Sequence, residues 1–139
     1  MMLTVNLPAN IQQLNVLNKM LADILTGNLE KYLINTQLIT EELLTNICSY
    51  AYDSKAGNVK FSCGVATFDG KNVIRISFED SGVPFDPFSQ QRPDTTKDAL
   101  DDRVEGGLGI TLIKKIASHY VYSRKNDKNY TDIFIDPKG

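Results

Sequence analysis

The sequence predicts an α/β (α+β) fold, a two-layer sandwich in which a mixed, mostly antiparallel sheet is covered on one face by helices. Three observations support this prediction. A strand pattern opens the chain, two helical patterns follow, and two hairpin patterns occupy the second half. The 139 residues, 42% of them hydrophobic, are enough for one sizeable core. We therefore expect a single domain over residues 1–139.

The first half of the chain predicts one strand and two helices. Leu3 to Leu7 alternate in the manner of a strand, and apolar residues then recur at helical spacing from Ile11 to Leu25. A second helical pattern runs from about Leu29 through Tyr52, with a jog expected near Asn35 and Thr36. The two helices should cover the sheet.

The second half predicts two hairpins separated by a polar segment and a helix. Val59 to Phe68 and Asn72 to Phe78 flank Asp69-Gly70, a pair that tolerates the positive φ of a tight turn. A final hairpin is expected around residues 126–128, with strands over residues 120–124 and 131–135.

The segment between the hairpins divides into a loop and a helix. Residues 84–105 are polar, rich in proline and without a sustained period, which predicts a long loop. A helix then follows from residue 106 to about Ser118. Such a loop is either a surface excursion or a functional segment, and its length favours the second interpretation.

Composition excludes several classes of function. The formal net charge of −2 leaves no basic excess for a phosphate backbone, so we expect no direct nucleic-acid binding. No segment reaches the ~20 apolar residues of a membrane span, and the first residues do not form a signal peptide. We therefore expect a cytoplasmic protein without membrane contact. Cys48 and Cys63 have no metal-ligand spacing, which favours reduced thiols.

The first candidate site is the pair Glu42 and Asn46 on the second helix. A four-residue spacing places both side chains on one helix face. The neutral Asn46 oxygen suits Mg²⁺, and the Glu42 carboxylate could act as a general base. The alternative is an ordinary solvated helix face.

The second candidate site follows the strand that ends near Phe78. Asp80 at a strand end can accept a hydrogen bond from an exocyclic amine such as adenine N6, and Gly82 would let the backbone approach the ring. The alternative is a simple turn in which Asp80 binds its own backbone.

The third candidate site is Gly106-Gly107-Leu108-Gly109 at a helix start. Unpaired backbone N–H groups and the helix dipole favour an anion there, and phosphate is the obvious candidate. The alternative is a tight turn that only needs glycine.

Taken in order, these sites resemble a known superfamily. Glu42 with Asn46, residues 80–82 and residues 106–109 are similar to the N, G1 and G2 boxes of GHKL ATPases, which include gyrase, MutL and histidine kinases. The resemblance covers nearly the whole chain. The strings TEELLTNICSYAY, EDSGVPFDP and GGLGITLIKKIAS are most similar to anti-sigma-factor serine kinases of the RsbW and SpoIIAB type.

The resemblance implies a Bergerat-type fold that binds ATP and Mg²⁺. Glu42 would be the catalytic base, Asn46 the Mg²⁺ ligand and Asp80 the adenine contact. Thr131, in the closing strand, would join the adenine network, and residues 84–105 would form the ATP lid. Five further positions would surround the nucleotide: Gly82, Gly106, Gly107, Leu108 and Gly109.

The resemblance also implies a function. The chain would be a serine/threonine protein kinase that phosphorylates a STAS-type anti-sigma-factor antagonist, regulates a sigma factor and forms a homodimer. One alternative is a nucleotide-dependent binding module without kinase activity, because residues 11–25 offer only Lys19 where such kinases tend to carry an Arg. A detached histidine-kinase catalytic domain ranks last, since we expect no phospho-acceptor helix before the first strand.

Overall fold

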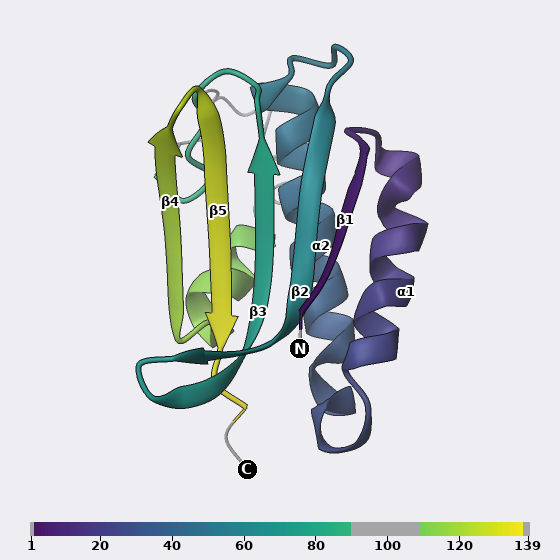
Figure 1. Ribbon diagram of the computed structural model, residues 1–139, viewed down its shortest axis with the longest axis vertical. Helices are drawn as coiled ribbons and strands as arrows, with labels where there is room; N and C mark the ends of the chain where they lie inside the picture. The colour runs from purple at the N-terminus through teal and green to yellow at the C-terminus, as the bar shows by residue number, and fades with distance from the viewer. Residues whose placement is uncertain (1, 90–108, 138–139) are drawn as a thin grey trace, which may run out of the picture.

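The computed structural model describes residues 2–89 and 109–137, in which helices cover one face of a five-stranded sheet (Figure 1). The strand order is β1-β2-β3-β5-β4. All four pairings among the described strands are antiparallel, whereas the sequence predicted a mixed, mostly antiparallel sheet. Two helices separate the first two strands and return the chain to the end of the sheet where β1 finished, so β2 must run against β1.

The first half begins with a strand and continues through helical segments of three kinds. Its elements are β1 (Met2–Pro8), a 3-10 turn (Ile11–Gln13), α1 (Leu14–Ile24), a 3-10 segment (Gly27–Tyr32), α2 (Leu33–Asn46) and a π-helical turn (Ile47–Ala51). The second helix expected from Leu29 is therefore three segments. The jog expected near Asn35 lies instead where α2 begins, and a further change of helical type follows Asn46.

The second half contains both expected hairpins. Its elements are β2 (Asn58–Phe68), β3 (Lys71–Asp80), a helix over residues 109–116, β4 (His119–Lys125) and β5 (Lys128–Ile135). Asp69 and Gly70 have φ values of 53° and 78°, and Asn126 and Asp127 have values of 54° and 62°. Two consecutive positive φ angles suit the two-residue turns that match strand twist. The predicted hairpins are thus confirmed.

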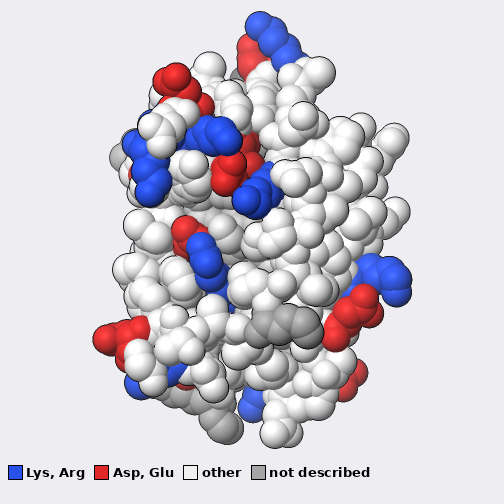
Figure 2. All heavy atoms as spheres, viewed as in Figure 1, with Lys and Arg blue, Asp and Glu red and all other residues white. Residues whose placement is uncertain are grey.

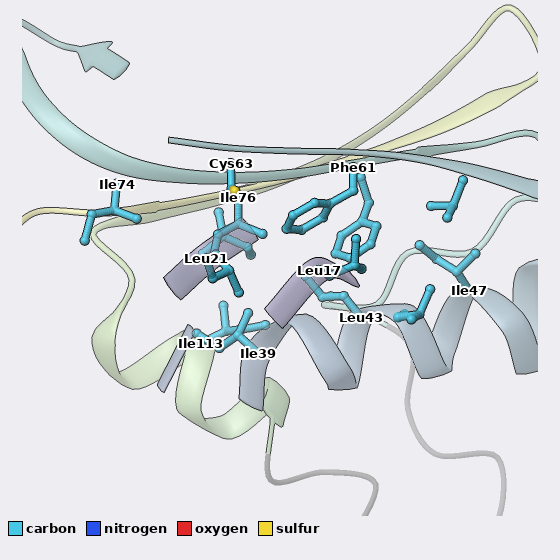
Figure 3. Close-up of a cluster of buried hydrophobic side chains, with 14 of the residues drawn as sticks. Leu17, Leu21, Ile39, Leu43, Ile47, Phe61, Cys63, Ile74, Ile76 and Ile113 are labelled. Carbon is cyan, nitrogen blue, oxygen red and sulfur yellow. The ribbon is translucent and has the colours of Figure 1, made fainter. Parts of the chain in front are cut away.

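The hydrophobic core lies between the sheet and the helices (Figure 3). The inward side chains of β2 and β3 pack against α1, α2 and the helix over residues 109–116. The largest fully buried side chains are Phe61, Phe78, Leu17, Leu21, Leu25, Ile39, Leu43, Leu44, Ile74, Ile76, Ile113 and Ile133. This packing fixes α2 beneath the centre of the sheet, which is where the candidate site begins.

The opposite face of the sheet is open to solvent, and on it Lys and Arg are interspersed with Asp and Glu (Figure 2). Arg75 pairs with Asp132 at 2.7 Å, and Lys128 pairs with Glu79 at 3.1 Å. Within residues 2–89 and 109–137, none of the helices combines the length and the apolar character that crossing a bilayer requires.

Candidate functional site

The candidate site lies where β3 ends, β5 begins and α2 approaches the sheet (Figure 1). Three residues predicted from the sequence meet there around one small cavity: Asn46 from α2, Asp80 from β3 and Thr131 from β5. All three are at least 95% buried. The remaining lining residues are Leu43, Ile47, Phe85 and Pro87. A polar group at each side and apolar walls suit a planar, partly polar ligand.

Asp80 is buried and held by two hydrogen bonds to one carboxylate oxygen. The Gly82 N–H donates to Oδ1 at 2.9 Å and the Asn129 side-chain amide donates to it at 2.8 Å. No described residue donates to Oδ2, so that oxygen remains available to a ligand. Burial raises the pKa of Asp80, and the two hydrogen bonds and the nearby Arg124 partly oppose that rise.

Gly82 is required for the packing of the turn that follows Asp80. A Cβ at this position would overlap the carbonyl group of Ala51, with its carbon only 2.5 Å away. The next N–H, from Val83, donates to the same Ala51 carbonyl at 2.8 Å. The turn after Asp80 is therefore attached directly to the end of the π-helical turn.

Glu42 and Asn46 lie together on α2, as their spacing predicted. The Asn46 amide nitrogen donates to the Glu42 Oε2 at 3.2 Å, so the side-chain oxygen of Asn46 is not the atom engaged with Glu42. Gly109 packs on the other side of Glu42, and a Cβ there would overlap the Glu42 side chain, with its Cγ at 2.5 Å. The start of the helix over residues 109–116 thus lies against the proposed base. Gly106, Gly107 and Leu108, and residues 90–105 of the expected lid, lie outside the described residues.

A comparison with protein families agrees with this geometry. The model described as "Histidine kinase-like ATPase domain" matches residues 7–135. The chain belongs to this family. No curated protein matches it. Membership implies ATP binding, generally with Mg²⁺, and a regulatory role.

The donor set of this ATPase domain fits a metal held mainly by its nucleotide. Among the described residues no three His, Cys, Asp or Glu side chains cluster to hold a metal ion. Mg²⁺ commonly takes only one or two protein ligands, with phosphates and waters completing its shell. The Asn46 side-chain oxygen fits that role, because its amide nitrogen is already engaged with Glu42.

The cavity lined by Asn46, Asp80 and Thr131 is nearly closed. The cavity offers about 10 Å³ of water-accessible space, the room of about one water molecule. Phe85 fills one wall and stacks on Tyr50 with ring centroids 5.0 Å apart. A planar ring of the size of adenine would fit there only if the cavity widened.

Sequence reasoning missed three residues that hold the turn after Asp80. Asn129 donates to Asp80, Arg124 donates to the Gly82 carbonyl at 2.7 Å, and the Tyr52 hydroxyl accepts from the Ser81 N–H at 2.8 Å. One signal could have found Asn129. It stands two residues before Thr131, just outside the predicted strand, and β5 begins early enough to place both side chains on one face.

A larger, open hollow of about 720 Å³ lies elsewhere on the ATPase domain. It is lined by residues 27–31 and Pro137 and contains none of the predicted site residues. Its polar lining residues, Asn28, Glu30 and Lys31, all lie on the one 3-10 segment. The predicted residues Asn46, Asp80 and Thr131 thus line the smaller cavity and not the larger hollow.

Proposed function

We propose that this chain is a serine/threonine protein kinase that uses Mg·ATP to phosphorylate a STAS-type anti-sigma-factor antagonist and thereby regulates a sigma factor. The family assignment supports ATP binding and a regulatory role, and the proposal goes beyond both. Its finer part rests on the resemblance of the three sequence motifs to anti-sigma-factor kinases.

The arrangement of Glu42, Asn46 and Gly109 is the observation that carries the proposal. A carboxylate lies 3.2 Å from the amide of the expected metal ligand and in contact with the first described residue of the Gly-rich segment. A general base must lie within reach of the reacting hydroxyl, near the transferred phosphate. Glu42 would occupy such a position with phosphates bound at the start of the helix over residues 109–116, where Gly109 has no side chain to displace it.

Each side chain has a distinct task in this reaction. Asp80 accepts a hydrogen bond from the adenine amine, and Asn46 supplies an oxygen to Mg²⁺, which when bound neutralises phosphate charge. Glu42 takes the proton of the acceptor Ser or Thr hydroxyl as that oxygen bonds to the γ-phosphorus. The bond from the γ-phosphorus to the β,γ-bridging oxygen breaks, and ADP leaves with its electron pair.

The test is transfer of label from γ-labelled ATP to a purified STAS-domain protein encoded near this chain. The wild type should label the partner, and Glu42→Gln should lower the rate by about 10²- to 10⁴-fold, the usual cost of losing a general base. ATP affinity should change only a few-fold, since Asn46 and Asp80 remain. Equal rates for Glu42→Gln and wild type would make the carboxylate structural.

A nucleotide-dependent binding module is the second candidate. In α1 the single basic residue is Lys19, and its ammonium lies 3.9 Å from the Asp23 carboxylate, so the helix offers no Arg to a phospho-acceptor segment. If ATP binds and changes affinity for the STAS protein while no label is transferred, this second function replaces the first.

A further inference from the structure

Asn129 is a buried polar residue whose place in the fold ties it to Asp80. It is 1% exposed and stands near the start of β5, directly opposite Asp80 in the register of β3 and β5. Asn129 belongs to none of the motifs found in the sequence. A buried amide is costly unless all of its hydrogen-bonding groups are satisfied, so its partners show what holds it there.

The amide nitrogen of Asn129 makes two hydrogen bonds. It donates to the Asp80 Oδ1 at 2.8 Å and to the Val83 carbonyl at 2.9 Å. A side-chain amide has two protons to donate, and both are used here. One residue therefore joins the carboxylate to the turn that follows it.

The amide oxygen of Asn129 accepts from groups on two segments. The Tyr122 hydroxyl donates at 2.5 Å, an Arg124 Nη1 donates at 3.2 Å and the Phe85 N–H lies at 3.4 Å. A flipped amide would place its NH₂ against these three donors, so the network fixes its orientation. Asn129 cannot turn its nitrogen away from Asp80 without breaking these contacts.

As a consequence, the two oxygens of the Asp80 carboxylate differ in their hydrogen bonding. Oδ1 accepts from Gly82 and from Asn129, whereas no described residue donates to Oδ2. Asp80 lines the small cavity together with Asn46 and Thr131. Oδ2 is thus the oxygen that an amine in the cavity would meet, and Asn129 keeps the carboxylate from rotating to exchange the two.

We propose that Asn129 is a positioning residue that sets the selectivity of the site for the 6-amino group of adenine, by holding the Asp80 carboxylate in one orientation. The inference rests on the proposed use of Asp80 as the adenine contact. It goes further in assigning that selectivity to a residue that does not itself line the cavity.

The experiment compares ATP with purine riboside 5′-triphosphate, which is ATP without the 6-amino group. Dissociation constants for both are measured by calorimetry, with Mg²⁺, for the wild type, Asn129→Ala and Asn129→Asp. The Asp variant keeps the size of the side chain but offers a carboxylate to Asp80 instead of a donor. Circular dichroism sets a temperature at which every variant is folded.

Two control variants separate selectivity from stability. Ile133→Val, on the same strand and 0% exposed, removes a core methylene far from the carboxylate. Asn72→Ala removes an exposed amide at the other end of β3. Neither should change the ratio of the two dissociation constants.

The wild type should bind ATP about 10- to 100-fold more tightly than the analogue, as expected for a hydrogen bond to a charged acceptor. In both Asn129 variants this ratio should fall by about fivefold or more, mainly through weaker ATP binding. If both ligands weaken equally and the ratio stays, Asn129 is only structural and the inference is overturned. If the wild type binds neither nucleotide, the proposed function itself fails.

Discussion

Replacing Asp80 by Asn separates the proposed adenine contact of this residue from the energetic cost of burying its charge. The amide has the size of the carboxylate, and its oxygen can still accept from Gly82 and Asn129, the two donors at 2.9 and 2.8 Å. Those donors hold the new oxygen in the Oδ1 position. The new NH₂ must therefore take the place of Oδ2 and present a donor to the cavity.

The loss of ATP affinity can be worked from that geometry. A hydrogen bond to a charged acceptor contributes about 1.5–3 kcal/mol, and a buried amine left facing another donor costs about 1–3 kcal/mol more. The two terms sum to about 2.5–6 kcal/mol, which corresponds to roughly 10²- to 10⁴-fold weaker binding. An inosine nucleotide has an acceptor oxygen in place of the amine, so Asp80→Asn should lower its affinity much less than it lowers the affinity for ATP.

Asp80→Asn should not lower the folding stability, in contrast to its effect on ATP affinity. Burial raises the pKa of Asp80 above the ordinary value of 3.8. A raised pKa means that protonated Asp80 stabilises the folded protein relative to ionised Asp80. This stabilisation is complete below the ordinary pKa and is lost as the pH rises through the pKa of the folded state. At neutral pH the ionised carboxylate therefore lowers the free energy of unfolding, and Asp80→Asn should unfold at the same temperature as wild type or higher.

Calorimetric titration with Mg·ATP and Mg·ITP, alongside thermal unfolding, measures both effects. Asp132→Asn is the matched control, because it removes a carboxylate that pairs with Arg75 on the open face of the sheet. It should leave ATP affinity unchanged. The reasoning fails if Asp80→Asn binds ATP within about threefold of wild type, or if its preference for ATP over ITP does not narrow.

Three further predictions concern the same site. Asn46→Ala should shrink the gain in ATP affinity that Mg²⁺ provides, measured as the ratio of dissociation constants with and without the metal, and an unchanged ratio would exclude Asn46 as a ligand. Gly109→Ala should destabilise the fold by about 1–3 kcal/mol in denaturant titrations and slow phosphoryl transfer, because the new Cβ overlaps Glu42. Binding needs the ionised form of Asp80, so the ATP affinity of the wild type should fall as the pH is lowered. Because burial raises the pKa of Asp80, this fall should begin at a higher pH than it would for a carboxylate of ordinary pKa. That component of the pH profile should be missing in Asp80→Asn.

The hairpins were predictable because their information is local. Asp69-Gly70 and Asn126-Asp127 adopt consecutive positive φ angles that few residue pairs tolerate, and alternating apolar residues flank both turns. The helical segment after Gly27 was less predictable. Its apolar spacing continues through three kinds of helix, and the changes at Leu33 and after Asn46 depend on packing against the sheet.

At the candidate site, the motif residues could be predicted from the sequence, but the residues that hold them in place could not. Glu42 and Asn46 were predictable as a pair because a helix places residues four apart on one face. Asn129 was not, since its partner Asp80 is 49 residues away in the chain and only the register of β3 and β5 brings them together. The sequence around Phe85 likewise gave no sign that its ring would line the small cavity and stack on Tyr50.

The sequence by itself determined the order of strands and helices, both hairpin turns and the chemical types at the site, because each follows from periodicity, turn conformation or side-chain chemistry within a few residues. Only the tertiary structure decided which Asp80 oxygen is available, that Gly109 contacts Glu42 and that Phe85 and Pro87 close the cavity. These features depend on distances between segments far apart in the chain, which are set by sheet register and core packing.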